Sequence, residues 1–177
     1  MRLFIAIELN KAMRSEISRA LKELKIRSSG GRFVHEDNLH ITLHFIGESV
    51  DLNGAVQAMK ASVRGIRPFE LFPDQYGYFE RNGSKTSFIS VGGQLTELDI
   101  LHESLESALA DNGFSREYKR FVPHITLGRS VEHDELVGEE MKQIQFSTSI
   151  IVPGITLFES TRERGRMVYT PLHREKF

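Results

Sequence analysis

The feature that most constrains this chain is a tetrapeptide that occurs twice. His40-Ile41-Thr42-Leu43 reappears as His124-Ile125-Thr126-Leu127, an offset of 84 residues between positions 40 and 124. The same offset aligns Phe4-Ile5-Ala6-Ile7 with Phe88-Ile89-Ser90-Val91. Because separate segments match at one spacing, we interpret the chain as a duplicated unit in which each copy carries one motif.

Each copy predicts a strand, a helix and a second strand that bears the motif. The run from Leu3 to Ile7 is apolar without polar alternation, which is typical of a strand buried on both faces. Asn10 is a suitable helix cap, and apolar residues at helical spacing follow it. In the second copy Thr96 is the predicted cap, and Gly113 suits the left-handed position that ends a helix.

The remaining elements are predicted from periodicity and turn residues. Asn82-Gly83 lies between two runs of strand-forming residues and is typical of a two-residue hairpin turn. Pro73-Asp74 is predicted to turn the chain out of a short strand at 69–72. We further predict a helix at about 52–63, a short helix within 132–142, and strands at 32–34, 39–46, 122–127, 150–158 and 167–172.

This order of elements indicates an α+β fold with helices covering one face of each sheet. No low-complexity linker separates the halves, so we predict a single domain over residues 1–177 made of two fused lobes. The duplicated units are expected at about 1–66 and 85–130, with the C-terminal strands completing the sheets.

Composition narrows the function classes. With 23 basic and 24 acidic residues the net charge is −1, so no overall field would hold a long nucleic acid. The absence of cysteine excludes disulfides and thiolate chemistry and fits a reducing compartment, so we expect a cytoplasmic protein. No apolar run is long enough to span a membrane. We expect no membrane contact and a monomer.

The two motifs carry the candidate chemistry. Alternate side chains of a strand share a face, so each motif directs an imidazole and a hydroxyl to one side. If a pseudo-two-fold axis relates the halves, His40 and His124 would meet and could divide acid and base roles at neutral pH without a metal. Thr42 and Thr126 could donate to phosphate oxygens, and Arg129 could neutralise transition-state charge. Local chemistry does not decide which histidine is the acid.

The paired His-x-Thr-x motifs resemble those of the 2H phosphoesterase superfamily, most closely its RNA 2',3'-cyclic phosphodiesterases, historically called 2'-5' RNA ligases. The resemblance implies a bilobal fold with two antiparallel sheets facing a central cleft, helices on the outside, and no metal or cofactor. It also implies hydrolysis of RNA 2',3'-cyclic phosphate ends to 2'-phosphomonoesters, with His40 as proton donor, His124 as proton acceptor and Arg129 on the phosphate. Further segments carry it: Arg2–Ile7, Asn38-Leu39, Phe45–Gly47, Pro123 and Glu159-Ser160.

Two other functions are compatible with the same residues. One is a 2'-5' RNA phosphodiesterase or ligase that acts on internal linkages. The other is a non-catalytic module that binds RNA ends. The expected partners are RNA 2',3'-cyclic phosphate ends or small cyclic nucleotides. A substrate panel separates the internal-linkage enzyme from the first function, and binding of cyclic-phosphate RNA without turnover would identify the module.

Several other residues have both a functional and a structural interpretation. His40 and His44 are four apart, but strand propensity and the missing zincin glutamate disfavour a metal pair. In a regular strand His44 would share the face of His40 and line the cleft, or it could be a bystander. The loop at 162–166 could touch an RNA backbone or form a solvated hairpin tip. Three aromatic residues could stack on a base or pack in the core: Phe33, Tyr78 and Phe79.

Overall fold

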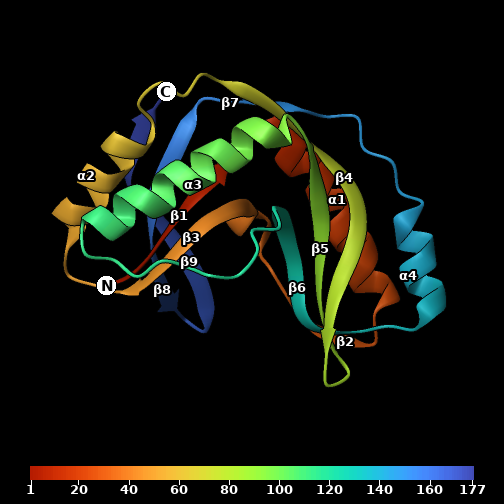
Figure 1. The fold of residues 1–177 in the computed structure, drawn as a ribbon. Coiled ribbons are helices and arrows are strands. Elements are labelled where there is room, and N and C mark those ends of the chain that lie inside the picture. Colours follow the sequence, from red (N-terminus) through yellow and green to blue (C-terminus); the bar gives the residue numbers. More distant parts are fainter.

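The computed structural model describes residues 1–177 as a nine-stranded antiparallel sheet with four α-helices (Figure 1). The helices are α1 (Lys11–Arg27), α2 (Leu52–Ser62), α3 (Leu95–Asp111) and α4 (Glu135–Lys142), with a 3-10 turn at Glu36–Asn38. The strands are β1 (Arg2–Glu8), β2 (Gly30–Phe33), β3 (His40–Glu48), β4 (Phe69–Arg81), β5 (Ser84–Gly93), β6 (His124–Glu132), β7 (Ile150–Val152), β8 (Gly154–Glu163) and β9 (Arg166–Lys176).

The strand order is β7-β4-β5-β6-β3-β1-β8-β9, with β2 added beside β6. The two central strands, β3 and β6, carry the two motifs and pair through Ile41 and Ile125. The sheet therefore has two halves that meet at the motifs. The two antiparallel sheets expected from the sequence are these two halves of one curled sheet.

The 84-residue offset holds for whole elements. Strands β3 and β6, and helices α1 and α3, have bounds that differ by 84 residues, and α2 and α4 occupy corresponding positions. The correspondence continues to β4 and β8, beyond the unit boundaries expected from the sequence. Since β4 lies in the half with β5 and β6, while β8 lies beside β1, each half of the sheet contains a strand from the other copy.

Helix ends follow the sequence in most places. The Asn10 side chain accepts a hydrogen bond from the Met13 N–H at 2.8 Å, so the predicted cap is confirmed. Gly113 follows α3 with φ +88°, as predicted. The predicted cap at Thr96 is wrong, because α3 begins at Leu95 and its cap residue is Gln94. The Gln94 side chain instead accepts a hydrogen bond from the backbone N–H of Glu70 in β4.

Two prolines changed the strands from those predicted. Pro73 does not end its strand, since β4 runs through it and the pairing with β5 shifts between Pro73 and Tyr76. This irregularity accommodates a residue that has no N–H to donate. Pro153 divides the predicted strand at 150–158 into β7, which pairs with β4, and β8, which pairs with β1. The hairpin turn at Asn82-Gly83 is confirmed by positive φ at both residues.

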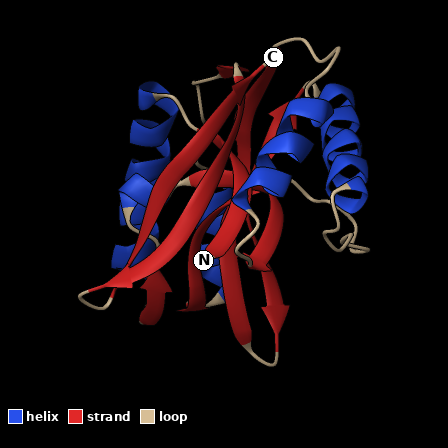
Figure 2. Ribbon diagram, turned by 90° about the vertical axis from the view of Figure 1, so that its left-hand side faces the viewer, coloured by secondary structure: helices blue, strands red, loops and turns tan.

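The helices and the two motifs lie on opposite faces of the sheet. Figure 2 shows the strands in the middle of the molecule with helices flanking them. One continuous core of 33 buried residues fills the space between helices and sheet under both halves, so neither half packs independently. A small separate cluster of Phe4, Ala6 and Phe158, with Tyr169 against it, lies on the other face. We call this second face the open face.

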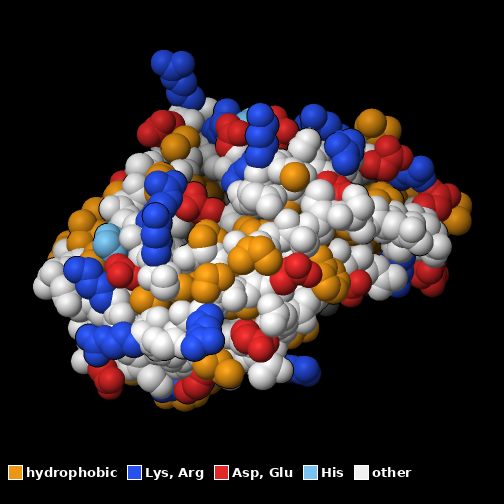
Figure 3. All heavy atoms as spheres, turned by 90° about the horizontal axis from the view of Figure 1, so that it is seen from above, with side chains coloured by type: hydrophobic (Ala, Val, Ile, Leu, Met, Phe, Trp, Pro, Cys, Tyr) orange, Lys and Arg blue, Asp and Glu red, His pale blue; other side chains and the backbone are white.

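The surface carries mixed charge. Basic and acidic side chains intermingle on the face seen in Figure 3, with hydrophobic side chains between them, which fits the net charge of −1. None of the four helices is both long and apolar enough to cross a bilayer.

Candidate active site

The structure brings the two predicted motifs together at the centre of the sheet. Ile41 of β3 pairs with Ile125 of β6, and the strands are antiparallel. The residues on either side of this pair are therefore exchanged, so that His40 lies toward Thr126 and His124 toward Thr42. Both isoleucines are fully buried against the helices. Because side chains alternate along a strand, both His-Thr pairs point to the open face.

Each imidazole is held by the same backbone contact. The Nδ1 atom of His40 lies 2.6 Å from the carbonyl oxygen of Asn38, and that of His124 lies 2.7 Å from the carbonyl oxygen of Val122. A carbonyl can only accept a hydrogen bond, so Nδ1 carries the proton in both rings. The Nε2 atom of each histidine is therefore the one that can take or give a proton on the open face.

Aromatic rings pack against both imidazoles in matching positions. Phe4 lies 5.0 Å from His40, and its repeat partner Phe88 lies 5.4 Å from His124, between ring centroids. Tyr169 meets His40 edge-on at 5.4 Å, and Phe79 meets His124 edge-on at 5.5 Å. Tyr169 was not predicted, because no motif or periodicity in the sequence of β9 indicates this contact.

Burial lowers the pKa of both histidines. The pKa of His40 falls to about 4, chiefly through desolvation, against which the bond to the Asn38 carbonyl acts; the charges of His124, Arg14 and Arg129 lower it further. Desolvation also lowers the pKa of His124, and the charge of Arg129 adds to it. Both rings are thus neutral at pH 7 in the free protein, and each can accept a proton at Nε2.

The two halves differ in a hydrogen bond at Nε2. In His40 this atom lies 2.7 Å from the Thr42 hydroxyl oxygen of the same motif. The Thr126 hydroxyl makes no such bond to His124, whose Nε2 is free. Since the Nδ1 atom of His40 holds the proton, the Thr42 hydroxyl is the donor to Nε2. The free His124 ring is therefore the more accessible proton acceptor.

A β-bulge in each motif strand decides which later residues reach the open face. The pairing of β3 with β1 skips Leu43, and the pairing of β6 with β5 skips Leu127. A skipped residue reverses the alternation beyond it. Arg129, five residues after His124, would face the helices in a regular strand, but the bulge turns it to the open face. Its guanidinium is exposed and makes no hydrogen bond or ion pair, so it is available to an anion.

The same bulge overturns the prediction for His44. A regular strand would have placed His44 on the face of His40, but the bulge at Leu43 turns it toward the helices, where it is 2% exposed. Phe45 takes the open-face position instead and is 54% exposed. His44 does not line the site.

The remaining candidates from the sequence are three aromatic residues and the loop at 162–166, and they differ in how far they are buried. Phe33 and Tyr78 pack against the main core, whereas Phe79 is 46% exposed beside His124. In the loop at 162–166, Arg162 donates to the Gly165 carbonyl, and Arg166 contacts Asp37 at 3.4 Å. This loop is an exposed hairpin tip between β8 and β9.

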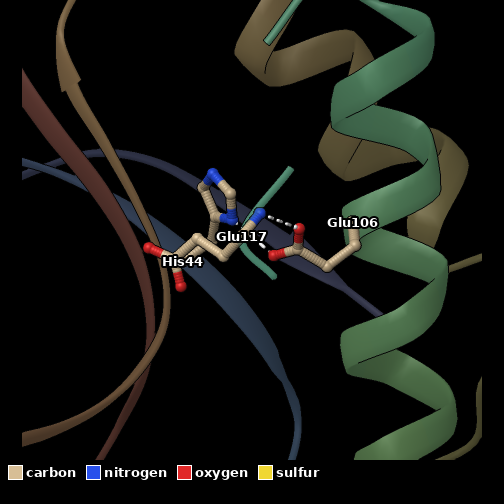
Figure 4. Close-up of side chains that lie close together, drawn as sticks. All are labelled: His44, Glu106 and Glu117. Atoms are coloured by element: carbon tan, nitrogen blue, oxygen red, sulfur yellow. Dashed lines mark hydrogen bonds and ion pairs between the residues drawn. The ribbon is translucent and has the colours of Figure 1, made fainter. Parts of the chain in front are cut away.

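One cluster has the residue types of a metal site. Ligand atoms of His44, Glu106 and Glu117 lie within 4.8 Å of one another on the helix side of the sheet (Figure 4). Both carboxylate oxygens of Glu106 already accept hydrogen bonds, from His44 and from the Glu117 backbone N–H. The carboxylate of Glu106 and the imidazole of His44 therefore already form a hydrogen-bonded pair.

Paired imidazoles, flanking hydroxyls and a free guanidinium lie on one open face, and these are the groups that phosphodiester cleavage without a metal requires. The chain belongs to the 2'-5' RNA ligase superfamily, whose model matches residues 13–162. The family predicted from the paired motifs is thus confirmed.

Two relatives span the chain. It is 31% identical to an RNA 2',3'-cyclic phosphodiesterase of Thermotoga maritima over 100% of this chain and 96% of that protein. It is 33% identical to one of Escherichia coli K12, over 98% and 94%.

Solved structures agree. Apo E. coli LigT has a TM-score of 0.76 at 31% identity, covering 99% of this chain and 96% of LigT. LigT complexed with 3'-AMP has a TM-score of 0.75 at 31% identity over 99% and 97%. A protein of Thermus thermophilus, with a TM-score of 0.80 at 24% identity over 99% and 97%, supports the fold. The predicted α+β fold is confirmed.

Proposed function

We propose that this protein is a metal-independent hydrolase that opens 2',3'-cyclic phosphates at RNA ends and leaves 2'-phosphomonoesters. The observation that carries the proposal is the matched pair His40 and His124, each locked at Nδ1 and presenting Nε2 on one face of the sheet. The names of the full-length relatives support this substrate class.

The hydrolysis can be written with the residues in place. Nε2 of neutral His124 takes a proton from water as the water oxygen attacks phosphorus. The bond from phosphorus to the 3' oxygen breaks, and protonated His40 gives its Nε2 proton to that oxygen. Thr42 and Thr126 donate to the non-bridging oxygens, and Arg129 offsets the additional negative charge of the pentacovalent state. Water loses one proton to His124, and the 3' oxygen gains one proton from His40, so the protons balance.

In the free protein His124 already has the charge state that its role requires, whereas His40 does not. A lowered pKa keeps His124 neutral, as a base requires. His40, whose pKa is about 4, must gain a proton to act as the acid. A bound phosphate supplies the reason, since a negative charge beside an imidazole favours its protonated form. A bound phosphate oxygen would take the place of the Thr42 hydroxyl beside Nε2 of His40. It would accept a hydrogen bond from Nε2 of the protonated ring.

The test uses purified protein, EDTA and an RNA oligonucleotide that ends in a 2',3'-cyclic phosphate. We expect turnover to persist in EDTA and the product to carry a 2'-phosphate, which 31P NMR distinguishes from a 3'-phosphate. Loss of turnover on chelation, or a 3'-phosphate product, would refute the proposal. Binding of the oligonucleotide without turnover would identify an RNA-end-binding module. Cleavage or joining of internal 2'-5' linkages at a higher rate would identify the alternative enzyme.

We also propose that the protein acts as a cytoplasmic monomer. Both histidines come from one chain, so the site needs no second copy. The absence of cysteine suits a reducing compartment. Sedimentation at working concentration tests the first statement, and fractionation of cells tests the second.

A further inference from the structure

Glu106 is a buried carboxylate in the middle of α3, on the side of the sheet opposite the proposed site. It is 2% exposed. One of its oxygens contacts Nδ1 of His44, and the other accepts a hydrogen bond from the backbone N–H of Glu117 at 3.0 Å (Figure 4). A single side chain thus connects a strand and a loop that are far apart in the sequence.

The two groups that Glu106 connects each lead to one of the proposed catalytic histidines. His44 lies in β3, four residues after His40, just past the bulge that sets the faces of this strand. Glu117 lies in the loop between α3 and β6, and this loop ends at His124. The strand that carries His40 and the loop that leads into His124 are therefore held to the same carboxylate.

Further contacts hold the loop to α3 around this point. The imidazole Nε2 of His102, one helical turn before Glu106, lies 3.6 Å from its carboxylate. The His102 ring stacks on Phe121 with ring centroids 4.0 Å apart and 3° between the planes. Phe121 precedes His124 by three residues. Arg116, in the same loop, pairs with Glu103 of α3.

The pair of His44 and Glu106 has no counterpart in the other copy of the repeat. At the 84-residue offset His44 corresponds to Gly128, and Glu106 corresponds to Lys22, whose side chain is 69% exposed. The other half of the sheet folds without such a pair. A buried, hydrogen-bonded polar pair is weak evidence for stability, since apolar residues of similar volume often replace it at no cost. Its presence in only one half points to a role in the site.

We propose that Glu106 is a positioning residue that sets the separation of His40 and His124 by joining β3 to the loop before β6. This inference rests on the proposed function. Glu106 touches neither substrate nor imidazole of the catalytic pair, so its loss should reduce the rate of the chemical step and leave phosphate binding by Arg129 and the threonines intact. A displacement of about 1 Å between reacting groups is enough to lower a rate about 100-fold.

Three variants test this role. Glu106→Leu removes both contacts at similar volume and should lower kcat by about 10- to 100-fold, with KM within about threefold of wild type. Glu106→Gln keeps an oxygen for the Glu117 N–H and places an amide N–H against Nδ1 of His44, which accepts it when the ring carries its proton on Nε2, so this variant should recover most of the rate. The double variant H44L/E106L removes the His44 imidazole as well, so this ring is not left unpaired in the core, and the Glu117 N–H that loses its acceptor belongs to an exposed loop residue. It should melt near the wild-type temperature and still have the low kcat.

The matched control is Leu105→Ala, on the same turn of α3 and fully buried. It destabilises the core and should leave kcat within about threefold of wild type at a temperature well below melting. A kcat for E106L or the double variant within that same range would overturn the proposal, as would a rise in KM that accounts for the loss. If wild-type protein does not turn over the cyclic phosphate, the proposed function fails instead, and the two failures are distinguished.

Discussion

The half of the sheet around His40 and the half around His124 share a scaffold and differ in chemistry. In both, a backbone carbonyl two residues earlier fixes the imidazole, a phenylalanine packs on it, and a bulge follows three residues later. At the open-face position after the bulge, however, one half has Phe45 and the other has Arg129. Only His40 is bonded at Nε2, to Thr42.

This comparison shows how a duplicated site can become asymmetric. The backbone contact and the bulge that aim each imidazole are common to both copies, so the face to which the two rings point follows from the repeat. The difference in role then depends on a few single positions that place charge and hydrogen bonds around one ring. Substitutions at matching positions of the two halves should therefore have unequal effects.

The largest effect is expected from the imidazoles themselves. H40A and H124A should each lower kcat by about 10²- to 10⁴-fold, the range that a positioned acid or base contributes. The double variant should lose little more than either single variant, because the two groups act in one step. Steady-state kinetics on a 2',3'-cyclic nucleotide measures this, and circular dichroism checks the fold. Additive losses would contradict a shared step.

The next effect separates Arg129 from Phe45. R129A should lower kcat/KM by about 10²-fold, since it removes the free cation beside the proposed phosphate position. F45A, at the equivalent position of the other half, should change it less than about fivefold. R129K should lie between them, because lysine keeps the charge and loses the planar fork. Equal effects of R129A and F45A would show that the asymmetry has no role in catalysis.

The hydroxyls should matter less. T42V and T126V each remove one donor to a phosphate oxygen, which corresponds to roughly a tenfold loss in kcat/KM. T42V should also make Nε2 of His40 more available in the free protein, so competitive inhibition by inorganic phosphate should weaken less for T42V than for T126V. Inhibition constants for phosphate measure the difference, and the reverse order would contradict the hydrogen bond described for His40.

The smallest effect concerns stability. The pKa of His40 is about 4 in the folded protein and ordinary when unfolded, so the unfolded chain binds this proton first as pH falls. Stability should therefore be full above about pH 7 and decline between about pH 6.5 and 4, by on the order of 1–3 kcal/mol for this residue. H40N should flatten that decline more than H124N does. Urea unfolding at pH 7.5 and pH 4.5 measures the loss of unfolding free energy between the two pH values. An equal loss in wild type and H40N would contradict the burial of His40.

Much of this site follows from the repeat. The 84-residue offset predicted which two histidines would meet, and strand alternation predicted that each threonine would accompany its histidine. Those inferences need only a period of two and a symmetry. The caps at Asn10 and Gly113 and the turn at Asn82-Gly83 are local and were predicted for the same reason.

The bulges at Leu43 and Leu127 could not be predicted, because strand periodicity assumes that no residue is skipped. The bulge at Leu43 turned His44 to the helix side of the sheet, and the bulge at Leu127 turned Arg129 to the open face. The network around Glu106 depends on contacts between α3, β3 and a loop, and no local pattern specifies those. Pro73 within β4 shows the limit of turn residues as signals, since pairing with β5 and β7 outweighs them.

The central claim is that His124 acts as the base and His40 as the acid. The most direct test measures H40A and H124A against wild type on a p-nitrophenyl phosphodiester, whose leaving group departs without a proton. If His40 is the acid, H40A should recover most of the wild-type rate on this substrate, while H124A should stay as impaired as on the cyclic phosphate. Recovery by H124A, or equal impairment of both variants, would contradict it.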